Sequence, residues 1–241
     1  MASPLIYYYN MNETPHIIRD FDSSLKGMKA SVLHMAAIAG GNLDNAVHGL
    51  LQRNEDLCND AIAEDEEVNA YERSIDKEGM EILLRFNPLA SDLRAVVASM
   101  KVSTNLERIA DQSENIARRA RKIIKKNEVP EIQLIKPVHA LAASLVAEAV
   151  RAFSDGNSQL ALTLFDKDQE LDRLHKKAIK DLTRAIEKDQ ENLRTYLNLI
   201  FIVRCLERIG DHAVNIGEDT VYIEEAADIR HIGPAALEEE E

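Results

Sequence analysis

The feature that most constrains this chain is an acidic motif that occurs twice, 100 residues apart. The copies read Leu106-Glu-Arg-Ile-Ala-Asp-Gln-Ser-Glu-Asn-Ile116 and Leu206-Glu-Arg-Ile-Gly-Asp-His-Ala-Val-Asn-Ile216. When residues 92–117 are aligned with 192–217, nine of 26 positions are identical. This separation is too long for a solenoid repeat and indicates two duplicated half-domains. Because the motif repeats a pair of carboxylates at i and i+4, we look for the function at these carboxylates.

The rest of the sequence is typical of helices. Only nine glycines and six prolines occur in 241 residues, and no segment alternates with a period of two. We predict an all-α fold of two tandem, pseudo-symmetric three-helix bundles. The first helix begins near Asp20, with a kink at Gly40-Gly41, and the others span about 54–86, 91–126, 131–154, 157–188 and 190–227. Residues 1–19 form a variable extension, 20–127 and 131–228 the two bundles, and 229–241 a mobile acidic tail.

Charge and cysteine content exclude several classes of protein. The net charge of −13 argues against nucleic-acid binding, which needs a basic face for phosphates. Cys58 and Cys205 lie far apart without a CxxC spacing, so neither a disulfide framework nor a zinc ribbon is predicted. The sequence has no apolar run near the motifs long enough to insert into a membrane and no basic stretch typical of a signal peptide. We expect a cytoplasmic protein.

Acidic residues interrupt the apolar seams along which the predicted helices pack. On the second and third helices these residues include Asp65, Glu72, Glu107 and Asp111. The two pairs lie about 20 residues before and after the turn at 87–90, so antiparallel packing brings them to a similar height at ~1.5 Å rise per residue. Burying ionised carboxylates costs several kcal/mol each unless they are compensated. Bound metal is one compensation, and a hydrogen-bonded, partly protonated cluster is the other.

The residue types favour metal. Carboxylate oxygens, with amide oxygens from Asn69, Asn115 or Asn215, suit Mg²⁺, Mn²⁺ or iron. In the second half, an offset of 103 places His175 where the first half has Glu72. The second cluster therefore carries less negative charge and is expected to bind differently. Arg108 and Arg208 flank the motifs, and we expect them to be structural.

Taken together, these motifs resemble the PhoU family of phosphate-transport accessory proteins. The resemblance rests on both Leu-Glu-Arg-Ile-(Ala/Gly)-Asp motifs, on Pro88-Leu-Ala-Ser-Asp-Leu-Arg94 and on Asp228-Ile-Arg-His231. It implies two three-helix bundles with metal clusters that hold iron, Mn, Mg or Zn. The metal ligands that it implies are Glu107, Asp111, Glu207, Asp211, Asp65, Asn69, Asp168 and Asp172, with Glu72 and His175 as further candidates.

The same resemblance implies a regulatory role. Such proteins dampen the phosphate-starvation response by linking the ATPase subunit of the phosphate ABC transporter to its sensor histidine kinase, often as homodimers. The sequence contains no pattern of nucleophile and base, so we expect a non-enzymatic adaptor. Two alternatives are a carboxylate-bridged metal enzyme of the ferritin-like type, whose only Glu-x-x-His here is Glu13–His16, and an inert helical scaffold.

Overall fold

The computed structural model describes the backbone of residues 14–230 and the side chains of residues 19–230. All regular structure in this range is helical. The elements are α1 (Thr14–Gln52), α2 (Glu55–Ala63), α3 (Asp65–Phe86), α4 (Ala90–Ile124), η1 (Pro130–Leu134), α5 (Ile135–Asp155), α6 (Ser158–Leu162), α7 (Leu164–Lys188) and α8 (Leu193–Glu225). The all-α fold of two three-helix bundles is confirmed. Most of the predicted N-terminal extension and acidic tail lies outside the described residues.

Two predicted helices are each broken once, at positions 99 residues apart in the two halves. Glu64 separates α2 from α3, and Thr163 separates α6 from α7. Both residues stay right-handed, with ψ of −12° and −15° instead of the −42° of a regular helix. The prediction of continuous helices at 54–86 and 157–188 was therefore wrong. Each break is a change in backbone ψ at a single residue near the acidic cluster. The periodicity of apolar residues in the sequence does not reveal such a local change.

Asparagine caps begin the broken helix of each half. The Asn54 side chain accepts hydrogen bonds from the backbone N–H groups of Asp56 and Leu57 at 2.9 and 3.4 Å. Asn157 accepts one from Leu160 N–H at 2.9 Å. These caps satisfy donors that the first turn of a helix leaves unpaired. The two caps are 103 residues apart, which supports the offset seen in the sequence.

Two other predicted helix features differ from the structure. α1 continues without interruption through Gly40 and Gly41, where we expected a kink. α4 begins at Ala90 and ends at Ile124, against the predicted 91–126, and no side chain caps its first turn. The end of α3 at Phe86 is confirmed, and Asn87 there has a left-handed φ of 46°.

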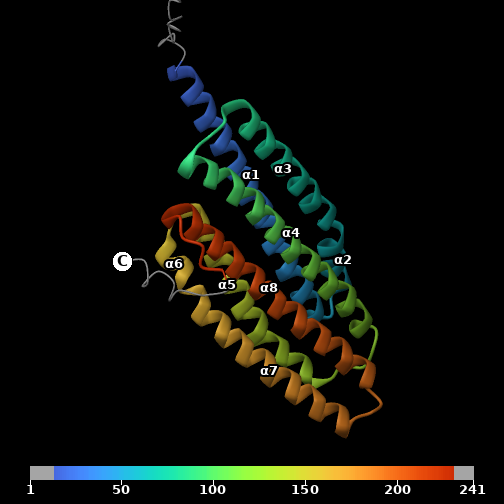
Figure 1. Cartoon of the computed structure of the whole chain (residues 1–241). Helices are drawn as coiled ribbons and strands as arrows, with labels where there is room; N and C mark the ends of the chain where they lie inside the picture. The colour runs from blue at the N-terminus through green and yellow to red at the C-terminus, as the bar shows by residue number, and fades with distance from the viewer. Residues whose placement is uncertain (1–13, 231–241) are drawn as a thin grey trace, which may run out of the picture.

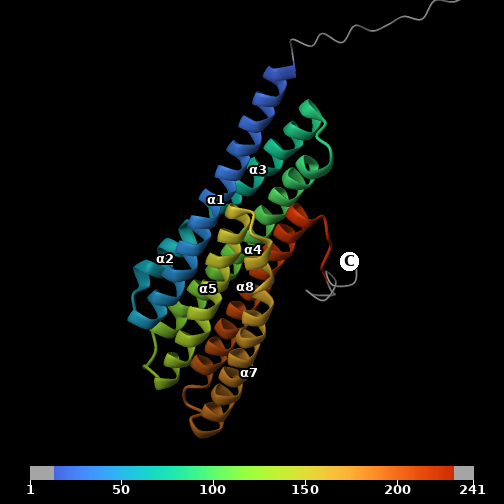
Figure 2. The same cartoon turned by 90° about the vertical axis from the view of Figure 1, so that its left-hand side faces the viewer.

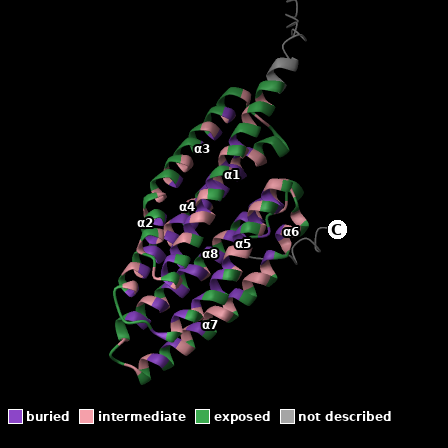
Figure 3. Ribbon diagram, turned by 180° about the vertical axis from the view of Figure 1, so that it is seen from behind, coloured by how far each residue is buried: buried purple, intermediate pink, exposed green. Residues whose placement is uncertain are grey.

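The two bundles share one apolar core. α4 and α8 pack against each other more extensively than any other pair of helices, and they carry the two copies of the motif. Figure 1 shows these helices side by side in the middle of the molecule, with α3 and α7 outside them. Figure 2 shows that the axes of the long helices are roughly aligned, and Figure 3 shows their buried faces turned inward. Ile109 and Ile209 of the motifs are both fully buried.

None of the described helices combines the length and the apolar character needed to cross a lipid bilayer.

Candidate metal sites in the two acidic clusters

The second half of the chain brings three ligand-type side chains together. One ligand atom each from Asp172 and His175 of α7 and Glu207 of α8 lie within 4.8 Å of one another. Both ring nitrogens of His175 are buried and have no hydrogen-bond partner among the described residues. A buried imidazole without a partner is costly, and a metal ion would satisfy it. The second acidic cluster therefore fits a bound cation.

Asp168 and Asp211 extend this cluster. Burial raises the pKa of Asp168, and the neighbouring Asp172 and Glu207 raise it further. The pKa of Asp211 is raised to about 6 by burial and then by Glu207, Asp168 and Asp172, although Arg208 opposes the shift. Like charges that raise one another's pKa values make a site that attracts cations. All four predicted residues of the second half thus interact with one another.

Gly210 allows the close approach of α7 to α8 at this cluster. A Cβ atom at this position would lie 2.3 Å from Leu171 Cδ2 and 3.3 Å from Asp168 Oδ1. Leu171 is fully buried, so it has little room to move. The glycine of the second motif, which is alanine in the first, is therefore required by packing.

The first acidic cluster contains the four predicted residues of the first half. Burial is the largest cause of the raised pKa of Asp65, followed by Glu114 and Asp111. The pKa of Glu107 is raised by burial and then by Asp111, with smaller effects of Glu72 and Asp65 in the same direction and of Arg108 in the opposite one. Asn69 donates a hydrogen bond to Asp65 Oδ2 at 2.9 Å.

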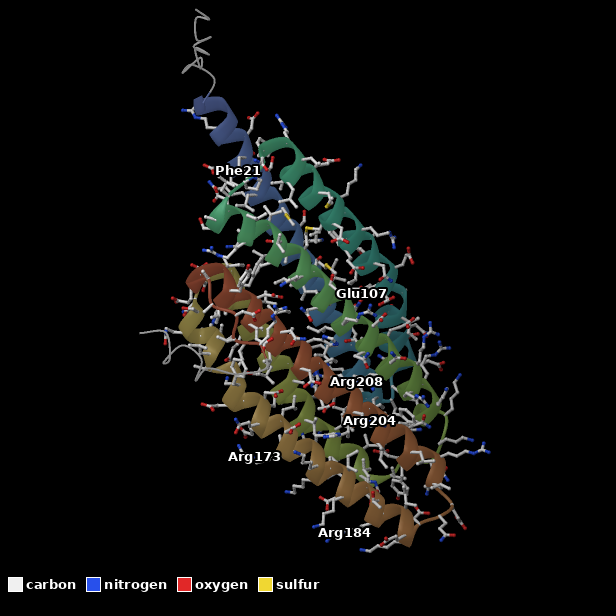
Figure 4. The ribbon with its side chains drawn as sticks, in the orientation of Figure 1. Phe21, Glu107, Arg173, Arg184, Arg204 and Arg208 are labelled. Atoms are coloured by element: carbon white, nitrogen blue, oxygen red, sulfur yellow. The ribbon has the colours of Figure 1, made fainter. Side chains whose placement is uncertain are left out.

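An arginine occupies part of this first cluster. Arg108 Nε lies 3.2 Å from Glu107 Oε2, and its terminal nitrogen lies 3.3 Å from Asp111 Oδ2. Glu107 Oε2 is buried and has no hydrogen-bond partner. Its contact with Arg108 is therefore an ion pair that lacks the geometry of a hydrogen bond. Arg208 has the same place in the second motif but forms no ion pair with a described residue. Figure 4 shows Glu107 on α4, and Arg204 and Arg208 on α8.

Two of the suggested supplementary ligands form hydrogen bonds through their amide nitrogens. Asn115 donates to the backbone carbonyl of Asp111 at 2.9 Å, within its own helix. Asn215 donates to Asn105 Oδ1 at 3.3 Å, and a ring nitrogen of His212 lies 3.1 Å from the same oxygen. Neither bond uses the Oδ1 atom through which an asparagine would bind a metal, so their role as ligands stays a prediction. His212 links α8 to α4, as expected of a histidine outside the site.

Both cysteines, His139 and His34 have structural contacts. Cys58 and Cys205 are buried and free, and burial raises the pKa of Cys58 to about 11. His139 lies 2.9 Å from Asp44 Oδ1, between α5 and α1. His34 contacts the ring of Tyr71. Neither histidine belongs to an acidic cluster.

His175 was only a further candidate in the ligand set that the resemblance implied, and the structure places it with Asp172 and Glu207. The offset of 103 places it at the position of Glu72, and this was the only signal for it. Its proximity to Glu207 depends on how α7 packs on α8, which the sequence does not give.

The chain matches the PhoU domain model twice, at residues 32–120 and 135–220. It is 34% identical over 228 residues to the phosphate-specific transport system accessory protein PhoU homolog of Pseudomonas aeruginosa, covering 94% of each chain. The homolog from Pseudomonas putida is 34% identical over 221 residues, covering 91% of this chain and 86% of the other.

Solved structures with the same fold agree with these matches. The crystal structure of PhoU from Pseudomonas aeruginosa superposes with a TM-score of 0.84 at 32% identity, covering 86% of this chain and all of that one. The phosphate transport system regulatory protein PhoU from Streptococcus pneumoniae gives 0.79 at 26% identity, covering 86% and 98%. With both halves matched and the bundle architecture shared, the chain belongs to the PhoU family.

Proposed function

We propose that this chain is a metal-binding regulatory accessory protein of phosphate uptake. The observation that carries the metal-binding part is the convergence of Asp172, His175 and Glu207, whose ligand atoms lie within 4.8 Å of one another. The names of the relatives, which are accessory or regulatory proteins of phosphate transport, support the physiological part.

Each cluster would hold its metal between two helices. In the second half the ligands would be Asp172, His175 and Glu207, with Asp168 and Asp211 beside them. In the first half they would be Asp65, Glu107 and Asp111, with Asn69 orienting Asp65. A bound cation would supply the positive charge that neutralises these carboxylates and would brace α7 against α8 and α3 against α4.

The donor atoms narrow the choice of metal at each cluster. An all-oxygen first cluster suits Mg²⁺, Mn²⁺ or ferric iron, whereas a cluster with one imidazole also suits Zn²⁺ or ferrous iron. The two clusters thus need not hold the same metal.

The regulatory role would be that of a cytoplasmic adaptor without catalytic activity. Its partners would be the ATPase subunit of the phosphate ABC transporter and a sensor histidine kinase, and it would lower the starvation response when phosphate is plentiful. Among the described residues no serine, threonine or cysteine hydrogen-bonds to a histidine, which supports an adaptor over a hydrolase. A homodimer stays a prediction.

Elemental analysis of the purified chain tests the metal sites. We would compare wild type with Glu107→Ala/Asp111→Ala and Glu207→Ala/Asp211→Ala, each expected to lose about half of the bound metal if the two clusters have similar capacity. Glu187→Ala/Glu191→Ala removes two exposed carboxylates outside both clusters and is the matched control. Equal metal content in all four proteins would overturn the ligand assignment.

A cellular assay tests the regulatory role independently. A bacterial strain without its own PhoU protein would be supplied with this chain, and a starvation-response reporter would be measured in phosphate-rich medium. Wild type is expected to restore repression. A reporter that stays fully active, although the chain is expressed and folded, would argue against the regulatory role and leave the metal sites intact.

The second candidate function, a carboxylate-bridged oxidase, rests on the Asp172-x-x-His175 arrangement opposite Glu207. Oxygen consumption on addition of ferrous iron would support it. Such enzymes need a second helix with the same pattern, and the Glu13–His16 pair lies outside the described side chains.

A further inference from the structure

A row of cations lies on the outer face of α7. Arg173, Lys177, Lys180 and Arg184 follow one another at spacings of four, three and four residues, so they share one helix face. All four are exposed. Figure 4 shows Arg173 and Arg184 projecting from the side of α7 that faces away from the other helices. We call these four residues the α7 cationic row.

Most of this row has no acidic partner. Arg184 lies 3.6 Å from Asp181, and the neighbouring Lys176 pairs with Asp172 at 3.0 Å. Arg173, Lys177 and Lys180 form no ion pair with any residue that the structure describes. In a chain with a net charge of −13, a row of unpaired cations is unexpected and marks a surface suited to anionic groups.

The row is a property of the second half alone. With the offset of 103, the corresponding positions on α3 are Ala70, Ser74, Lys77 and Glu81. Lys77 and Glu81 lie 3.9 Å apart and neutralise each other. The duplicated architecture therefore does not require cations here, and their presence needs another explanation.

The end of the described chain lies beside the start of α7. α8 ends at Glu225, and the left-handed φ of 58° at the next residue, Ala226, turns the chain back. Ile229 is then buried in a small apolar cluster with Ala161 of α6, and Phe165 in the first turn of α7 packs against this cluster. The last residues of the sequence thus start beside the N-terminal end of α7, and the cationic row follows in the middle and C-terminal half of the same helix.

The sequence after Ile229 contains negative charges that could pair with the α7 cationic row. Four consecutive glutamates, Glu238–Glu241, close the chain, and seven residues separate them from Arg230. Nine residues from Ile229 to Glu238 can span up to about 30 Å at ~3.3 Å per residue. At ~1.5 Å per residue, Arg173 lies about 12 Å and Lys180 about 22 Å beyond Phe165 along α7. The glutamates can therefore reach the row.

We propose that Glu238–Glu241 docks on the α7 cationic row of the same chain and masks this surface from acidic partner proteins. Each exposed ion pair is weak and is screened by salt. The short connection nevertheless holds the glutamates at an effective concentration of millimolar order. An acidic partner therefore binds the row only by displacing the tail.

Lysine reactivity tests the contact in the full chain. We would measure by mass spectrometry how fast an amine-reactive ester modifies Lys177 and Lys180 at low ionic strength, in wild type and in a variant with all four glutamates replaced by glutamine. Lys26 and Lys122 are exposed lysines outside the row, without ion pairs to described residues, and serve as internal controls. The variant should show a rise of a few-fold at Lys177 and Lys180 only, and high salt should abolish the difference. Equal rates in the two proteins would overturn the proposal.

Carbodiimide cross-linking separates a contact within the chain from one between chains. It joins carboxylates directly to lysines, and a mixture of ¹⁴N- and ¹⁵N-labelled protein reveals which chain each partner comes from. Cross-links from Glu238–Glu241 to Lys177 or Lys180 with one isotope on both sides support the proposal. Mixed-isotope cross-links would assign the row to a second copy, and cross-links spread over the other lysines would indicate no specific site; either result contradicts the proposal.

Discussion

The two acidic clusters share a motif but differ in what surrounds it. In the first cluster, Arg108 lies against Glu107 and Asp111, and Asn69 donates to Asp65. In the second, Arg208 forms no ion pair with a described residue, and His175 joins Asp172 and Glu207. Arg108 partly neutralises two carboxylates of the first cluster, whereas in the second cluster Lys176 pairs with Asp172 at 3.0 Å and the other carboxylates form no ion pair with a described residue.

A duplicated motif therefore does not imply two identical sites. The carboxylates recur, but ligand identity, glycine content and flanking charge have diverged. Sites of this kind are expected to differ in metal preference, in tolerance to substitution and in response to pH.

The largest expected effect is on metal preference. His175→Glu would replace the imidazole by the carboxylate found at Glu72 in the first half. Zn²⁺ affinity should fall about 10-fold or more, because even substitutions of residues that only support a metal ligand often reduce affinity by this factor. Mn²⁺ affinity should be retained, because Mn²⁺ accepts carboxylate oxygens. Isothermal titration in a Glu107→Ala/Asp111→Ala background isolates this cluster.

The reciprocal substitution sharpens this test. Glu72→His in a Glu207→Ala/Asp211→Ala background should raise Zn²⁺ affinity of the first cluster if the position alone determines preference. Unchanged Zn²⁺ affinity in the His175→Glu variant would exclude His175 as a ligand.

Gly210→Ala should destabilise the chain by about 1–3 kcal/mol, because its Cβ would overlap the buried Leu171 side chain. Gly27→Ala is the matched control, since a Cβ there meets nothing within 4 Å. This control should instead stabilise by about 0.8–1 kcal/mol through helix propensity. Thermal denaturation compares the two. A Gly210→Ala variant as stable as the control would show that α7 and α8 have room at the cluster.

Arg108→Gln should increase Mn²⁺ affinity at the first cluster. The metal must displace two ion-pair contacts, each worth up to about 1 kcal/mol, so the gain is roughly 3- to 10-fold. Titration in the Glu207→Ala/Asp211→Ala background measures it. Arg208→Gln, tested at the second cluster, should change little because Arg208 forms no ion pair with a described residue. A loss of affinity in Arg108→Gln would mean that the arginine supports the metal-bound state.

The smallest expected effect is on pH dependence in chelator-treated protein. The folded pKa of Asp211 is about 6, above its ordinary value of 3.8. The folded state thus holds the proton more tightly, and this contribution to stability is lost as pH rises from 3.8 to about 6. The contribution of Asp211 to the free energy of unfolding changes by less than about 1.4 kcal/mol per pH unit. The change is reduced further because the residue is exposed.

Asp211→Asn should remove that part of the pH dependence, measured as the free energy of unfolding in urea at several pH values. Asp228→Asn is a control of opposite sign, because Arg230 holds the pKa of Asp228 below its usual range. Pairing of Asp228 contributes at neutral pH and is lost as pH falls. Identical pH profiles for wild type and Asp211→Asn would contradict the shift at Asp211.

The sequence by itself determined the helical class, the duplication and the seams that carry the acidic residues. Periodicity specifies which residues share one face of a helix, so Glu107 with Asp111 and Glu207 with Asp211 could be recognised directly. The asparagine caps and the stop at Phe86 were also readable, because they depend on local backbone chemistry.

Only the tertiary structure decided what these faces meet. The breaks at Glu64 and Thr163, the inclusion of His175 and the pairing of Arg108 depend on how neighbouring helices rotate and approach. The shared core between α4 and α8 and the return of Ile229 to α6 likewise depend on contacts between distant residues. Helix periodicity contains no information on distances between helices, because these follow from the packing of whole side-chain surfaces.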